Sequence, residues 1–176
     1  QRLAWLTGFT GSAGMAVVLQ KSAAILVDGR YSIQVRKQTN PKLYEPLDFS
    51  GGALKEWLKK NAKGGARIGF DPWLHSQSGF AALKTKFSFN QVDLVQVETN
   101  PIDQIWTQQP PLPLAPVYIH PVSVAGRASE EKIVEIASVV KENGADAAII
   151  TSPDSIAWLL NIRGGDIPNT PVALGF

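Results

Sequence analysis

The sequence predicts an α/β fold in which helices flank a mixed β-sheet. Short apolar, β-branched segments of strand length recur along residues 1–107. Between them lie stretches whose apolar residues repeat every three or four positions, as on one face of a helix. Glycine or proline follows most of these segments, where an element should end. This alternation of strands and helices is typical of the α/β class.

Each element of the first part follows from its local pattern. The first two strands are joined by Gln20-Lys21-Ser22, which is short enough for a hairpin turn. Leu54, Trp57 and Leu58 have helical spacing, and Gly64-Gly65 closes that helix. We expect strands over 15–19, 23–27, 43–49, 67–70 and 92–97, and helices over 31–38, 52–63 and 76–87, with a short helix around 102–106.

A proline-rich segment divides the chain. Residues 108–116 hold four prolines, which favour an extended, semi-rigid spacer. We therefore predict a first domain at 1–107, a linker at 108–120 and a second α/β domain at 121–176. Its single β-α-β-like unit is too short to cover both faces of a sheet, so we expect this domain to be truncated.

Within this second part the pattern predicts two helices and one strand. Ser129 has the character of an N-cap, and the following glutamates complement the helix dipole. The Ser129-Glu-Glu-Lys132 sequence is therefore interpreted as a helix cap followed by an exposed lysine, and not as a catalytic pair. Residues 147–150 are expected to form a short buried strand, and Ser152 or Asp154 to cap the next helix.

Composition excludes several functions. The net charge is only +2, and the basic residues are spread along the sequence, so nucleic-acid binding is not expected. Cysteine is absent, which removes disulfides, thiolate metal ligands and a cysteine nucleophile. No apolar run reaches the roughly 20 residues of a membrane span. We expect a cytoplasmic protein without membrane contact, although the chain begins at Gln1 and any preceding targeting segment is invisible.

Candidate chemical sites in the sequence favour structural explanations. The glycine-rich segment Gly8–Gly14 lacks the spacing of a phosphate loop or a dinucleotide fingerprint. The two histidines, His75 and His120, are far apart, and the acidic residues are scattered, so no metal or cofactor is expected in this chain. Asp28 should cap a turn after a buried strand, with Arg30 paired to a carboxylate. Arg163-Gly-Gly-Asp166 has opposite charges around flexible glycines and is interpreted as a loop stabilised by local hydrogen bonding.

Five segments resemble Xaa-Pro aminopeptidases of the creatinase/prolidase ("pita-bread") superfamily. The opening Arg2–Gly14 resembles the family's RLxWLTGFTGSAG, and Asp28-Gly-Arg-Tyr31 with Gln34 resembles DGRYxxQ. Gly69-Phe-Asp-Pro72 resembles GxDP, and Asp154–Pro168 is similar to DSIAWLLNIRGxDIP. Ala125–Lys132 is similar to the start of the family's second domain. Together, in this order, the segments indicate the three-domain form of the enzyme.

The resemblance implies a creatinase-type first domain, lacking its usual opening strand and helix, and a truncated second domain. It implies that the whole enzyme removes an N-terminal residue that precedes proline. Two divalent ions, manganese in many members, would be held by two Asp, one His and two Glu of a third domain that lies outside this chain. The chain alone is therefore expected to be inactive.

The resemblance also implies partners and a surface. The N-terminal domains of this superfamily support dimer contacts and cover the active-site entrance, so we expect a homodimer and contact with the catalytic domain. Two alternatives stay open: a free-standing interaction domain without peptidase activity, and a nucleotide-binding α/β protein. The residues predicted at the interface or substrate entrance are Phe9, Gly11, Ser12, Arg30, Tyr31, Arg163 and Asp166.

Overall fold

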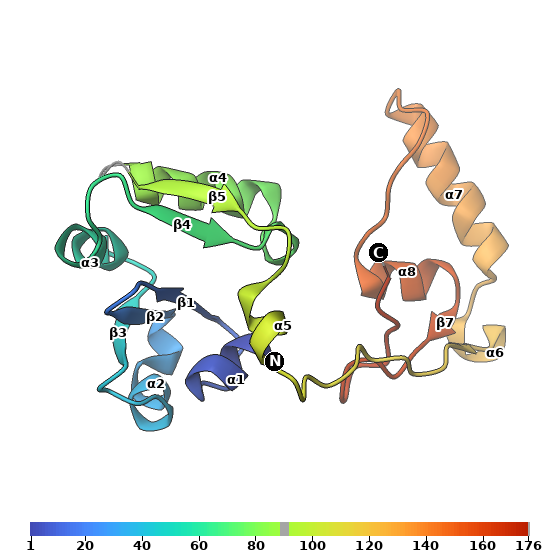
Figure 1. Cartoon of the computed structure of the whole chain (residues 1–176). Coiled ribbons are helices and arrows are strands. Elements are labelled where there is room, and N and C mark those ends of the chain that lie inside the picture. The colour runs from blue at the N-terminus through green and yellow to red at the C-terminus, as the bar shows by residue number, and fades with distance from the viewer. Residues whose placement is uncertain (89–91, 176) are drawn as a thin grey trace. The chain divides into compact units, whose positions relative to one another are not determined.

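The computed structural model describes residues 1–88 and 92–175, which fall into two compact units, Gln1–Gln109 and Pro110–Phe176 (Figure 1). The predicted α/β class is confirmed. The first unit contains α1 (Arg2–Thr7), β1 (Gly14–Val18), β2 (Ala23–Val27), η1 (Gly29–Tyr31), α2 (Ser32–Gln38), β3 (Tyr44–Asp48), α3 (Ala53–Asn61), β4 (Arg67–Phe70), η2 (Pro72–Leu74), α4 (Gln77–Phe87), β5 (Asp93–Gln96) and α5 (Pro101–Ile105).

The strands of the first unit form two small sheets. In the first, β1 pairs antiparallel with β2, and β2 pairs parallel with β3, so this sheet is mixed as predicted. The expected hairpin turn joins β1 to β2, and the Leu19 N–H donates to the Ser22 carbonyl across 2.8 Å. The other sheet is the parallel pair β4–β5, with Ile68 opposite Leu94.

Strand β2 supplies side chains to both faces of its sheet, because successive residues of a strand point to opposite sides. Ala24 and Leu26 pack into a cluster that also holds Trp57 and Leu58 of α3 and draws in side chains of β4 and β5. Ile25 and Val27 pack on the other side with Phe9 and with Val35 of α2. Burial of one such aliphatic side chain contributes about 1.5–3 kcal/mol.

Helix α1 was not predicted from the sequence, since six residues are too few to show a helical period. It is held against α5 by Trp5 and Trp106, whose stacked rings lie 5.2 Å apart between centroids. Each ring thereby removes apolar surface of the other from water. Tertiary contact, and not intrinsic propensity, therefore stabilises this short helix.

The second unit contains β6 (Tyr118–Ile119), α6 (Val122–Ala125), α7 (Ser129–Glu142), α8 (Pro153–Leu159) and β7 (Ile162–Arg163). Strands β6 and β7 pair antiparallel. The prediction of a buried strand at 147–150 is wrong: these residues form no strand, and Ile149 is 93% exposed. An extended segment needs a hydrogen-bonded neighbour to become a strand. Here residues 145–148, Ile150 and one side of α7 instead line an open groove of about 510 Å³.

The interpretation of Ser129 and Lys132 is also wrong. Ser129 is the first residue of α7 and does not cap it; its hydroxyl donates to the Leu159 carbonyl across 2.7 Å. Lys132 is only 2% exposed, and its ammonium donates to the Trp158 carbonyl at 2.9 Å and to the Asn161 side chain at 2.7 Å. These bonds satisfy acceptors at the end of α8, where cations are favoured.

Candidate functional site

The glycine-rich loop begins where α1 ends. The Thr7 hydroxyl donates to the Leu3 carbonyl at 2.7 Å and accepts the Phe9 N–H at 3.1 Å, which turns the chain inward at Phe9. The Phe9 ring is 1% exposed and packs with Ile25, Val27 and other buried residues. Phe9 therefore lies beneath the surface of the loop and shapes it from below.

Two glycines pack directly on the Phe9 ring. A Cβ placed on Gly11 would lie 2.3 Å from Cζ of Phe9, and one placed on Gly14 would lie 2.8 Å from Leu3 and 2.9 Å from the Phe9 ring. All three distances are shorter than the contacts that real Cβ atoms make. Glycine is required here for close approach of the backbone, which explains a glycine-rich loop without any phosphate site.

The turn after β2 carries the predicted ion pair. Asp28 accepts the Arg30 backbone N–H at 2.9 Å and caps η1, as expected. The same carboxylate accepts the guanidinium Nε of Arg30 at 3.0 and 3.1 Å. These hydrogen bonds hold the pKa of Asp28 below, and that of Arg30 above, their ordinary values. Because the pair is exposed, its role is to fix the direction of Arg30 more than to stabilise the fold.

The loop and the turn meet, although they are far apart in sequence. The hydroxyls of Ser12 and Tyr31 lie 2.7 Å apart, and the Phe9 and Tyr31 rings meet edge to face at 5.6 Å. The hydrogen bond with Ser12 lowers the pKa of the Tyr31 phenol. We call the exposed side of residues 9–14 and 28–31 the loop–turn surface.

A polar cluster continues this surface along α2. Gln38 accepts the Thr10 N–H at 3.0 Å through its carbonyl oxygen and donates to the Thr10 hydroxyl at 2.9 Å. Gln34 donates to the Gln38 carbonyl oxygen at 3.1 Å. Sequence reasoning missed Thr10 and Gln38. The four-residue spacing of the two glutamines, which places them on one helix face, was the available signal.

Arg163 and Asp166 lie in the second unit, and both side chains form hydrogen bonds to nearby backbone groups, as predicted for this loop. The Arg163 guanidinium donates to the carbonyls of Ala157 and Ile162, at 3.2 and 2.7 Å. Asp166 accepts the backbone N–H groups of Ala115 at 3.0 Å and Leu174 at 2.8 Å. Nearby backbone groups bind both charges in fixed geometry, so each side chain organises its own loop.

Metal-binding clusters and membrane-spanning helices can be searched for over the residues that the structure describes. Within residues 1–88 and 92–175, no group of three or more His, Asp or Glu side chains could hold a metal ion. Over the same residues, no helix is both long and apolar enough to cross a membrane. The loop–turn surface offers hydroxyls, amides and one directed guanidinium. These groups are suited to hydrogen bonding with another surface.

The comparisons with known proteins cover both units. Residues 1–105 and 108–176 each match a family model described as a creatinase/prolidase N-terminal domain. Xaa-Pro aminopeptidase 2 of Sus scrofa is 36% identical over 174 residues, which are 97% of this chain and 26% of that protein. Aminopeptidase P1 of Arabidopsis thaliana is 31% identical over 176 residues, or 100% of this chain and 27% of that protein.

Among solved structures, an X-prolyl aminopeptidase of Caenorhabditis elegans matches with a TM-score of 0.85 and 30% identity. The match covers 98% of this chain and 29% of that one, which is described as a cytosolic enzyme with a di-nuclear active site. The chain thus spans between a quarter and a third of these relatives, and corresponds to their N-terminal part.

Proposed function

Because this chain belongs to the creatinase/prolidase N-terminal domain family, we propose that it is the non-catalytic N-terminal region of a metal-dependent Xaa-Pro aminopeptidase. Such an enzyme hydrolyses the bond between an N-terminal residue and a following proline. The observation that carries the proposal is the match of the entire chain to proteins named for that activity.

The metal chemistry belongs, in this proposal, to the part of the enzyme that follows residue 176. Residues 1–88 and 92–175 supply no ligand set for it. The relative from Caenorhabditis elegans is described as having a di-nuclear active site, which supports two divalent ions in the whole enzyme. Our expectation that they are manganese rests on the family resemblance. Two such ions would generate the nucleophile and stabilise charge in the transition state.

The loop–turn surface serves, in this proposal, as a contact for the catalytic domain or for a second copy at the substrate entrance. The hydroxyls of Ser12 and Tyr31 are joined by a hydrogen bond, and Arg30 is directed by Asp28. Preorganised polar groups give a contact specificity at little entropic cost. A wall of this kind beside an active site would limit the length of peptide that enters.

Hydrolysis of peptides with proline in second position tests the activity. We expect the enzyme that contains this chain to release the first residue, and residues 1–176 with added manganese to release none. Cleavage by the isolated chain would overturn the assignment as non-catalytic. An enzyme that cleaves only peptides lacking proline at that position would overturn the assigned specificity.

A charge deletion tests the entrance role. Arg30→Gln in the enzyme should lower KM for long peptides more than for dipeptides, because a displaced wall restricts long peptides less, or it should lower the oligomer mass. Arg36→Gln is the matched control, because Arg36 is exposed on the neighbouring helix α2 and lies outside the loop–turn surface. Unchanged KM values and mass in Arg30→Gln would count against the entrance role while leaving the peptidase assignment intact.

The alternative of a free-standing interaction domain differs in one observable. It requires that the source gene end without the Asp, Asp, His, Glu, Glu ligand set expected of the peptidase. The division into domains at 1–107 and 121–176, the homodimer and the cytoplasmic location also stay proposals. Sedimentation and cell fractionation of the enzyme would test the last two.

A further inference from the structure

One tryptophan of the first unit is almost fully exposed. Trp73, in η2, is 87% exposed, and its neighbour Leu74 is exposed too. Of the five tryptophans in the chain, all of which the structure describes, it is the most exposed. Single apolar residues on a surface need no explanation. Trp73 differs because the segment that presents it is firmly anchored.

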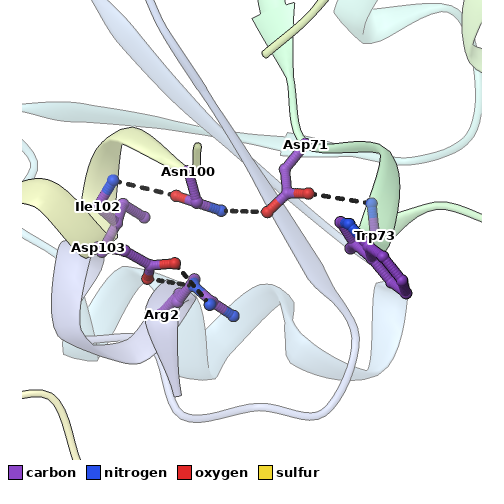
Figure 2. Close-up of polar contacts among 6 residues, drawn as sticks. All are labelled: Arg2, Asp71, Trp73, Asn100, Ile102 and Asp103. Carbon is purple, nitrogen blue, oxygen red and sulfur yellow. Dashed lines mark hydrogen bonds and ion pairs between the residues drawn. The ribbon is translucent and has the colours of Figure 1, made fainter. Parts of the chain in front are cut away.

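Figure 2 shows the anchor. The Asp71 carboxylate accepts a hydrogen bond from the backbone N–H of Trp73 at 3.0 Å and another from the side-chain amide of Asn100 at 2.8 Å. Asn100 is buried and also accepts the Ile102 N–H at 3.0 Å, which caps α5. A single chain of hydrogen bonds thus links η2 to the start of α5.

A second contact fixes α5 in turn. Asp103 of α5 accepts two hydrogen bonds from the Arg2 guanidinium, at 2.7 and 2.8 Å, in the bidentate geometry that gives orientation (Figure 2). The turn that carries Trp73 is therefore tied through α5 to α1. The backbone of Trp73 is held in place before any partner arrives.

We propose that Trp73, with Leu74, anchors the first unit to the peptidase portion that follows residue 176 in the proposed enzyme. This inference rests on the proposed function. A large exposed aromatic on a preorganised turn has the properties of an interface hot spot, because its burial yields much apolar area with little loss of entropy.

The length of the relatives favours this partner. The chain spans 26% and 27% of the two curated relatives, so most of each polypeptide lies outside it. A covalently attached partner acts at high effective concentration and needs no association step.

A second copy of the chain fits less well. Two-fold symmetry would bring the same patch of both copies together. If the two Trp73 rings met on the two-fold axis, neither could fill a pocket of the other, and an unlike contact between copies builds open chains unless its rotation closes.

Fluorine NMR of protein labelled with 5-fluorotryptophan tests the inference. The Trp73 resonance is identified by its loss in Trp73→Phe, a conservative change at an exposed site. In a sample of residues 1–176 alone, the chemical shift of this resonance should differ between H₂O and D₂O, as it does for an exposed ring. In the whole enzyme that shift should disappear. Trp57, 4% exposed and assigned through Trp57→Phe, is the buried reference in both samples.

The outcomes separate the possibilities. Loss of the solvent shift in the enzyme, both at high protein concentration and after dilution to monomer, supports the inference. A Trp73 ring that stays exposed in an enzyme active on residue–proline peptides overturns it without touching the proposed function. A shift that returns on dilution assigns the contact to a second copy and also overturns it. Cleavage of residue–proline peptides is measured in a separate assay, and its absence would be a failure of the proposed function.

Discussion

Substitution of Gly11 by alanine should destabilise the first unit, although the residue lies in a loop. The new Cβ would lie 2.3 Å from Cζ of Phe9, against 3.4–4 Å for ordinary contact. Phe9 is buried and cannot move aside freely. Overpacking of this kind costs about 2–3 kcal/mol. The lower entropy of the unfolded alanine chain returns roughly 0.5–1 kcal/mol. The expected net loss is therefore about 1–2.5 kcal/mol.

Urea unfolding followed by tryptophan fluorescence measures this loss. With a slope of about 1–3 kcal/mol per molar urea, the midpoint should fall by roughly 1 M. Gly29→Ala is the matched control on the same surface, because its Cβ would meet nothing within 4 Å. It should be neutral or slightly stabilising.

A double mutant isolates the cause. Leucine at position 9 lacks the ring atoms that Gly11 touches, so Phe9→Leu should lower stability by about 1–2 kcal/mol on its own. In that background Gly11→Ala should cost less than about 0.5 kcal/mol, which is a strong coupling between the two sites. Equal costs of Gly11→Ala in both backgrounds, or equal effects at Gly11 and Gly29, would refute the packing argument.

Three further predictions concern other contacts. The pKa of Asp103 is lowered by its hydrogen bonds to Arg2, so this contact stabilises the fold above the unfolded pKa, about 3.9, and is lost as pH falls through the folded value. Asp103→Asn should flatten the loss of stability between about pH 5 and pH 2 in acid titrations. Asn100→Ala should cost about 1–2 kcal/mol in urea unfolding, because α5 loses its cap and Asp71 a donor. Lys132→Ala should cost the second unit about 2–3 kcal/mol by Trp158 fluorescence, whereas the exposed Lys141→Ala should not change it.

The loop–turn surface could be foreseen only in part. Each of its halves was visible as a short motif. Asp28 was correctly predicted to cap the turn and Arg30 to pair with a carboxylate, and the structure shows that this carboxylate is Asp28. The contact of Ser12 with Tyr31 could not be deduced, because it depends on the packing of β1 and β2 around Phe9. No local pattern marks Trp73 as exposed, and only the tertiary structure shows that its side chain faces water.

What the sequence alone determined is what depends on neighbours along the chain. The hairpin between β1 and β2, the faces of α3 and α4 and the α/β class all follow from local periodicity and turn residues, which act over a few positions. The order of five motifs further identified the family. Tertiary structure decided the rest: Lys132 is buried because α8 ends in carbonyls that need a donor, and residues 147–150 form no strand because none lies alongside. Burial and strand pairing are settled by segments distant in sequence, so no local pattern encodes them.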